Sequence, residues 1–327
     1  MNKKLIFISL VGIISAGIIL IMNLSYDSLS RYSYSDEKAR ELIKENLDKS
    51  EIEYIVEYQI DPGTFINYVK AENFNVYHID EYNELDINLY YLDNEELVNF
   101  TEQIIEKADI SEVNGYTNEY YYQDLLYWYT YGDEYNPNSI LIYNPNSEEA
   151  YLNDDYTVSN RIPYNLVEAN YISSSNDDKV LIKASMNDKL ISMCEAISFD
   201  LKISNCGGLE VEKSYVSYNE QIQLYQQAQD EYGATAIMYC DLPGHSENQL
   251  GFALDFIVEN EDEFDETRQY EWLDENAYKY GFIQTYKEEF SVITNKNERV
   301  NHFRYVGVNI ATRVQESGKS LQEVLSK

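Results

Sequence analysis

The distribution of apolar and polar residues begins with one long apolar segment. Residues 5–22 carry no charge, and Lys3 and Lys4 precede them. As a helix, these ~18 residues would rise about 27 Å, close to the thickness of the bilayer core. Positive charge on the N-terminal side predicts a cytoplasmic N-terminus and an external remainder. We therefore expect a signal anchor over residues 1–24, with a cleaved signal peptide as the alternative, followed by a polar spacer over 25–35.

Residues 36–136 show the apolar spacing of short helices. One helix is expected to begin near Asp36 and another near Asn94. Between them, Ser50 and Glu53 have the spacing of a capping box, in which each side chain satisfies a backbone N–H of the other residue. This pattern predicts a small, acidic, mostly helical domain.

Residues 137–327 mix helical and strand patterns, and two Asn-Pro turns at 136 and 144 mark the boundary before them. Helices are expected over about 187–201, 219–231 and 270–281, and strands over 209–215, 252–258, 282–286 and 302–307. Because helices and strands do not alternate in regular βαβ units, we predict an α+β fold.

Composition narrows the possible partners and the cysteine pairing. The formal charge is −34, which argues against nucleic acid as a partner, because phosphate binding needs a basic face. Three cysteines cannot all pair within one chain. Cys194 lies on a predicted helix and Cys206 soon after it, so a bridge between them is possible if the chain folds back. Cys240 is interpreted as a free, buried thiol.

Three blocks in the second half resemble a known family in order and in residues: PGHSENQLGFALDF at 243–256, EWLDENAYKYGFI at 271–283 and NHFRYVG at 301–307. They are similar to the zinc D-alanyl-D-alanine carboxypeptidases of the vancomycin-resistance (VanY) type, which trim peptidoglycan stem peptides. The resemblance covers about residues 137–327. It implies a carboxypeptidase-like domain in which a central antiparallel sheet, flanked by helices, presents the metal.

The resemblance also assigns metal-site positions, from the family pattern Ser-x-His-x-x-Gly-x-x-x-Asp. Asp255 and His302 stand at two of the three zinc-ligand positions, and Ser246 and Gly251 match as well. The first ligand histidine is replaced by Asn248. A zinc peptidase needs three protein ligands and an open place for water, so this replacement removes one of the three metal-binding side chains.

The catalytic positions of the resemblance are replaced too. The family's Glu-Pro-Trp-His block reads Arg-Val-Asn-His here, which puts Arg299 at the position of the general base and Asn301 at that of the tryptophan. The arginine that helps to hold the substrate carboxylate is replaced by Val216. A cation in place of the base would repel a zinc ion instead of activating its water.

These observations favour a membrane-anchored, single-pass protein whose C-terminal domains lie outside the cell. On this interpretation the carboxypeptidase-like domain is inactive, needs no cofactor, and binds a peptidoglycan peptide or a cell-surface protein. The alternative is an active zinc D,D-carboxypeptidase with divergent ligands, for which His245 is the candidate substitute. A third hypothesis makes the helical first domain the interaction module.

Overall fold

The computed structural model describes residues 27–32, 36–176, 178–261 and 263–326. The chain divides into two compact units, Met1–Asn114 and Gly115–Lys327. The predicted signal anchor, residues 1–24, lies outside the described residues. Among the helices that are described, none has the length and apolar character needed to cross a membrane.

The first unit is built from short helices around a small apolar core that includes Ile43, Ile55 and Phe65. Its α-helices are α2 (Glu37–Asn46), α3 (Lys49–Glu57), α4 (Ile79–Asp86), α5 (Asn94–Ile104) and α6 (Ile110–Tyr116), with the unit boundary inside α6. The predicted capping box was wrong by two residues. Asp48 accepts from the backbone of Glu51, and the Glu51 side chain accepts from the Asp48 N–H, because the aspartate already caps α3.

The division between the units falls earlier than the Asn-Pro turns suggested. Tyr116 and Tyr120 donate their hydroxyls to the carbonyls of Leu141 and Ile142, at 3.0 and 2.7 Å. These bonds attach the segment after Gly115 to the second unit. A side-chain bond to backbone more than twenty residues away leaves no periodic signal in the sequence.

The second unit combines helices with a five-stranded sheet. Its helices are α7 (Tyr122–Tyr131), α8 (Asn187–Leu201), α9 (Ser204–Gly207), α10 (Tyr218–Tyr232), α11 (Ala236–Tyr239), α12 (Arg268–Asn276), α13 (Ser291–Thr294), α14 (Gly307–Ser317) and α15 (Leu321–Leu325). Its strands are β1 (Ile140–Leu141), β2 (Tyr156–Thr157), β3 (Leu166–Glu168), β4 (Ser173–Ser174), β5 (Leu181–Lys183), β6 (Leu209–Lys213), β7 (Ala253–Val258), β8 (Phe282–Gln284) and β9 (His302–Tyr305). The α+β prediction is confirmed.

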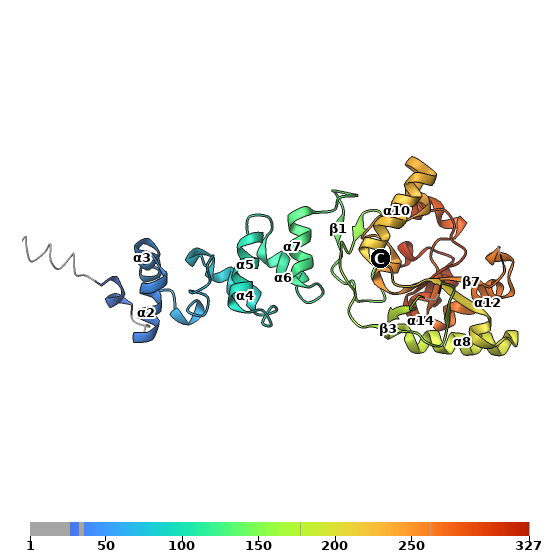
Figure 1. Cartoon of the computed structure of the whole chain (residues 1–327), viewed down its shortest axis with the longest axis horizontal. Coiled ribbons are helices and arrows are strands. Elements are labelled where there is room, and N and C mark those ends of the chain that lie inside the picture. The colour runs from blue at the N-terminus through green and yellow to red at the C-terminus, as the bar shows by residue number, and fades with distance from the viewer. Residues whose placement is uncertain (1–26, 33–35, 177, 262, 327) are drawn as a thin grey trace, which may run out of the picture. The chain divides into compact units, whose positions relative to one another are not determined.

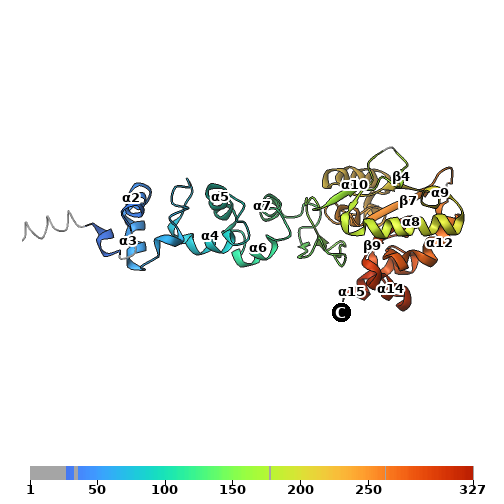
Figure 2. The ribbon, with the colours of Figure 1, turned by 90° about the horizontal axis from the view of Figure 1, so that it is seen from below.

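The main sheet has the strand order β4-β6-β7-β9-β8. All neighbours are antiparallel except β4, which runs parallel to β6, so the predicted antiparallel sheet has one parallel edge. Leu254 and Phe256 point from β7 into the main core, which α8 covers through Leu190 and Ile197. In both ribbon views α10 lies on the side of β7 opposite to α8 (Figures 1 and 2). Side chains alternate along a strand, so Asp255 faces the α10 side.

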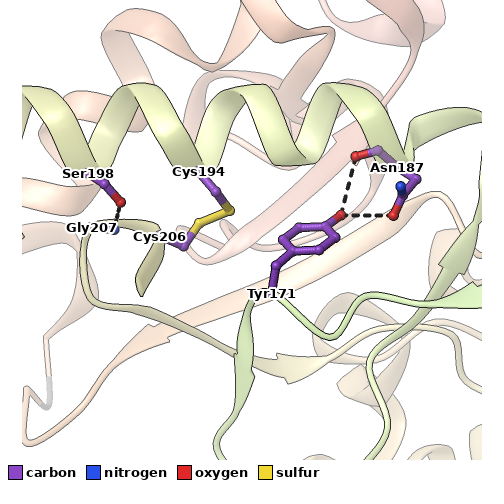
Figure 3. Close-up of a disulfide and its surroundings, with 6 residues drawn as sticks. All are labelled: Tyr171, Asn187, Cys194, Ser198, Cys206 and Gly207. Carbon is purple, nitrogen blue, oxygen red and sulfur yellow. Dashed lines mark hydrogen bonds between the residues drawn. A yellow bond between two sulfur atoms is a disulfide. The ribbon is translucent and has the colours of Figure 1, made fainter. Parts of the chain in front are cut away.

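A disulfide joins Cys194 on α8 to Cys206 on α9, which confirms the possible pairing, and Cys240 is a free thiol. Figure 3 shows the bridge beside two further ties to α8. Ser198 accepts from the Gly207 N–H, and the Tyr171 hydroxyl donates to oxygens of Asn187. The bridge therefore holds the left-handed turn that enters β6 against the middle of α8.

Candidate functional site

Three charged side chains meet in one row across the sheet. Asp255 on β7 lies opposite His302 on β9 and opposite Lys213 on β6. Residues that face each other on one side of an antiparallel pair have Cβ atoms about 5 Å apart, so their side chains interact. Lys213 joins the row because a bulge between Val211 and Lys213 shifts the register. Val211 packs in the core, and the extra residue turns Lys213 to the opposite face.

His302 is held between two carboxylates. Its Nδ1 lies 2.7 Å from Asp255 Oδ1 and its Nε2 lies 3.0 Å from Glu247 Oε2. The Glu247 oxygen also accepts from the Thr285 hydroxyl at 2.8 Å. Burial lowers the pKa of His302, but the Asp255 and Glu247 carboxylates outweigh it and raise the pKa to about 9. The ring is therefore an imidazolium at neutral pH, with both nitrogens donating.

Asn248 and Val216 serve the backbone next to this row. The Asn248 side-chain amide donates to the Ser214 carbonyl at 3.0 Å, and the backbone carbonyl of Asn248 accepts from the Val216 N–H at 3.3 Å. Both side chains are buried. Asn248 thus fixes the chain that follows β6, and Val216 places an apolar group where the resemblance expects a substrate-binding cation.

Arg299 points to a carboxylate of its own. Its guanidinium donates to both oxygens of Asp241, at 2.8 and 3.1 Å, and lies over the Tyr286 ring at 4.5 Å from the centroid. Lys296 adds a second cation 3.5 Å from Asp241 and pairs with Asp154 at 2.7 Å. Burial raises the pKa of Asp241, but Arg299 and Lys296 outweigh it and hold that pKa well below its usual range. The base position is therefore part of a buried ion network.

His245 does not join Asp255 and His302. Its Nδ1 lies 2.6 Å from the Asn153 carbonyl, and its Nε2 lies 2.6 Å from Asp133 Oδ2. Burial raises the pKa of Asp133, but hydrogen bonds from His245 and Ser139 outweigh it and lower the pKa. Both ring nitrogens are therefore engaged away from the candidate metal positions.

The remaining predicted residues shape the cavity around the row. Ser246 and Asn301 line a cavity of about 360 Å³ together with Asn248, Asp255 and Arg299. Gly251 has φ +74°, and a Cβ there would lie 2.7 Å from a side-chain carbon of Leu166. Only glycine fits this left-handed turn into β7 without strain.

Four charged residues of the site were missed in the sequence: Lys213, Asp241, Glu247 and Lys296. Glu247 lies inside the matched Ser-x-Asn block, and its carboxylate type was the available signal. Asp241 could have been sought, because an arginine in place of a buried glutamate requires a new counter-ion. Lys213 carried no signal, since its orientation depends on the bulge.

Comparison with known proteins supports the family that the three sequence blocks suggested. Residues 183–308 match the family described as VanY, D-alanyl-D-alanine carboxypeptidase. The chain therefore carries a VanY-type domain. The match supports the VanY-type metallopeptidase family that the three sequence blocks resembled.

Individual relatives support the VanY-type domain over part of their length. A D-alanyl-D-alanine carboxypeptidase of Enterococcus faecalis is 40% identical over 95 residues, which cover 28% of this chain and 34% of the relative. One from Enterococcus faecium is 26% identical over 187 residues, covering 54% of this chain and 59% of the relative. The chain thus spans between a third and three fifths of these relatives.

One solved structure shows the same fold, and another is similar over part of the chain. A structure of the LdcB LD-carboxypeptidase, described as revealing the basis of peptidoglycan recognition, has a TM-score of 0.52 and 29% identity, covering 58% of this chain and 90% of that one. A VanY D,D-pentapeptidase in complex with Zn(II) has a TM-score of 0.46 and 26% identity, covering 54% and 98%.

The donors in this VanY-type domain do not fit a zinc ion. Zinc sites in proteins use cysteine, neutral histidine or carboxylate ligands, and the first position here is the amide of Asn248. The second and third, Asp255 and His302, bond to each other, and the other ring nitrogen of His302 lies 3.0 Å from a Glu247 oxygen, so both nitrogens already face carboxylates. Within the described residues, no group of three or more His, Cys, Asp or Glu is placed to hold a metal ion.

Proposed function

We propose that this protein is anchored in the cell membrane and exposes a VanY-type domain that binds a peptidoglycan peptide, or a surface protein that presents one, without hydrolysing it. The relatives named as D-alanyl-D-alanine carboxypeptidases supply the substrate class. The replaced residues stand at the positions of a metal ligand, the general base and the arginine that holds the substrate carboxylate. The sequence blocks that build the sheet remain. A fold that keeps its cleft and loses its chemistry is suited to binding.

One observation carries the proposal: cations of the protein stand where the metal and its base would act. His302 lies between the carboxylates of Asp255 and Glu247, and the Lys213 ammonium lies 3.8 Å from Asp255 Oδ2. Arg299 occupies the base position and is neutralised by Asp241. Charges of the side chains thus balance the carboxylates that a metal would otherwise neutralise.

Two features support an exported location. The apolar residues 5–22 after Lys3 and Lys4 have the length and flanking charge of a signal anchor. The Cys194–Cys206 disulfide favours an oxidising compartment, because disulfides are rare in reducing cytosol.

The first test is zinc content by elemental analysis, after the full-length protein in detergent has been exposed to excess zinc and desalted. We expect almost no retained zinc and no release of D-alanine from a peptide ending in D-Ala-D-Ala. Near-stoichiometric zinc together with hydrolysis would refute the proposal. A His245→Ala variant would then show whether that residue completes the site.

A restored variant provides the positive control. Asn248→His, Arg299→Glu and Val216→Arg return the family's residues, but Arg299→Glu would place two carboxylates together at Asp241. The design therefore also needs Asp241→Asn. Gain of zinc binding by this variant, with none in the parent, would assign the difference to these positions.

A further inference from the structure

The candidate site opens into a longer cleft along α10. The cavity of about 360 Å³ beside Asp255 shares Lys213, Leu224 and Gln227 with a neighbouring cavity of about 710 Å³. Together they follow one face of α10, from Glu220 near its start to Glu231 near its end. This spacing of three or four residues is that of side chains on one side of a helix.

The cations that line this cleft are engaged by carboxylates. Among the described residues, they pair as Lys179 with Glu168, Lys213 with Asp255 and Arg299 with Asp241. Lys213 also lies 3.9 Å from Glu212, so it stands between two acids. A peptide carboxylate that enters the cleft meets cations that each already have a carboxylate within 4 Å.

Carboxylates, in contrast, are present in excess. Asp178 and Glu231 also line the cleft, and within the described residues neither forms an ion pair with a lysine, arginine or histidine. Glu220 lines it too, but its carboxylate accepts from Ser217 in the capping box of α10. The whole chain adds a net charge of −34. A concave surface lined by one sign of charge concentrates ligands of the opposite sign.

We propose that the cleft selects its peptide through a free ammonium group and not through the C-terminal carboxylate. This inference rests on the proposed binding function and specifies its ligand chemistry. Val216 offers no charge to a carboxylate, whereas Glu231 lines the adjoining cavity and can accept from an ammonium group. The substrate-binding arginine is replaced by Val216, and carboxylates remain in the lining. The cleft therefore prefers a positively charged ligand group to a negatively charged one.

The test compares three forms of one short, fluorescently labelled peptide ending in D-Ala-D-Ala, by fluorescence anisotropy with the full-length protein. The forms carry lysine with a free carboxylate, lysine with a C-terminal amide, and norleucine with a free carboxylate. We expect the amide to bind as well as the acid, and norleucine to bind about tenfold more weakly. The lysine peptides should also weaken as salt is added, since exposed charges are screened.

Matched variants locate the effect. Glu231→Gln should weaken the lysine peptides about threefold and leave the norleucine peptide unchanged, because an exposed ion pair contributes modestly. Asp230→Asn removes the same charge from the next residue of α10, which lies outside the cleft lining, and should change nothing.

The outcomes separate the two levels of the argument. If amidation abolishes binding and norleucine does not, or if Lys213→Gln weakens the acid peptide, the cleft recognises a carboxylate and the inference is overturned while the binding function stands. If none of the three peptides binds, the proposed function fails and the inference fails with it.

Discussion

Raising the pH from 6.5 to 9 should remove a large part of the free energy of unfolding through a single residue, His302. Burial opposes its protonation, but Asp255 and Glu247 raise its pKa from 6.5 to about 9. A group whose pKa is higher in the folded state stabilises fully below its unfolded pKa and loses that contribution as pH rises through the folded value. At 1.36 kcal/mol for each unit, the loss is about 3 kcal/mol between these pH values.

The buried Lys183 changes the pH dependence of stability in the opposite direction, so its contribution has to be separated from that of His302. Burial, with a smaller effect of Arg161, lowers the pKa of Lys183 from 10.5 to about 8. A depressed lysine pKa makes its contribution to stability rise with pH above about 8, so the total pH profile is flattened there. The difference between the parent and a His302→Gln variant removes this contribution, because Lys183 is present in both.

Urea unfolding of both proteins with a chelator present, at several pH values between 6.5 and 9, gives that difference. The parent should lose its advantage over His302→Gln as pH rises. Because the chain has three histidines, NMR can assign each imidazole by substitution and follow the His302 signal directly. A His302 pKa below its ordinary value of 6.5 would refute the imidazolium assignment. So would stability that rises with pH when zinc is added, because metal binding requires the neutral ring.

Three further changes test the packing around the site by chemical denaturation. Asp241→Ala should lower the free energy of unfolding by about 3–5 kcal/mol, because it leaves Arg299 buried without its partner. A double variant with Arg299→Met should recover much of this loss. Equal losses for the single and double variants would contradict the pairing. Replacing both disulfide cysteines by serine should cost about 3 kcal/mol, since the bridge closes a short loop, and serine at the third cysteine is the control. Gly251→Ala should lower the free energy of unfolding by about 1–3 kcal/mol, because of its positive φ and the contact of the new Cβ with Leu166. Gly132→Ala is the control and should cost less, because Gly132 has positive φ but no neighbour within 4 Å. Equal effects would exclude the contact as a cause.

The sequence determined the features that depend on neighbouring residues. Helix α8 occupies the predicted range 187–201, and the strands at β6, β7, β8 and β9 all begin within a residue of their predicted starts. The apolar spacing carried this information because packing against one core requires a fixed period along each element. The ordered blocks also indicated the VanY-type family, and with it Asn248, Arg299 and Val216 as replaced positions.

Only the tertiary structure decided what the replaced residues do. Arg299 meets Asp241 across 58 positions, and His302 meets Glu247 across 55, so no local pattern connects them. Lys213 reaches Asp255 because a single bulge reverses its face, and strand periodicity alone would have pointed it into the core. The family positions were fixed by sequence order, but the counter-ions that replaced the chemistry were fixed by strand register, which arises only when distant segments pair.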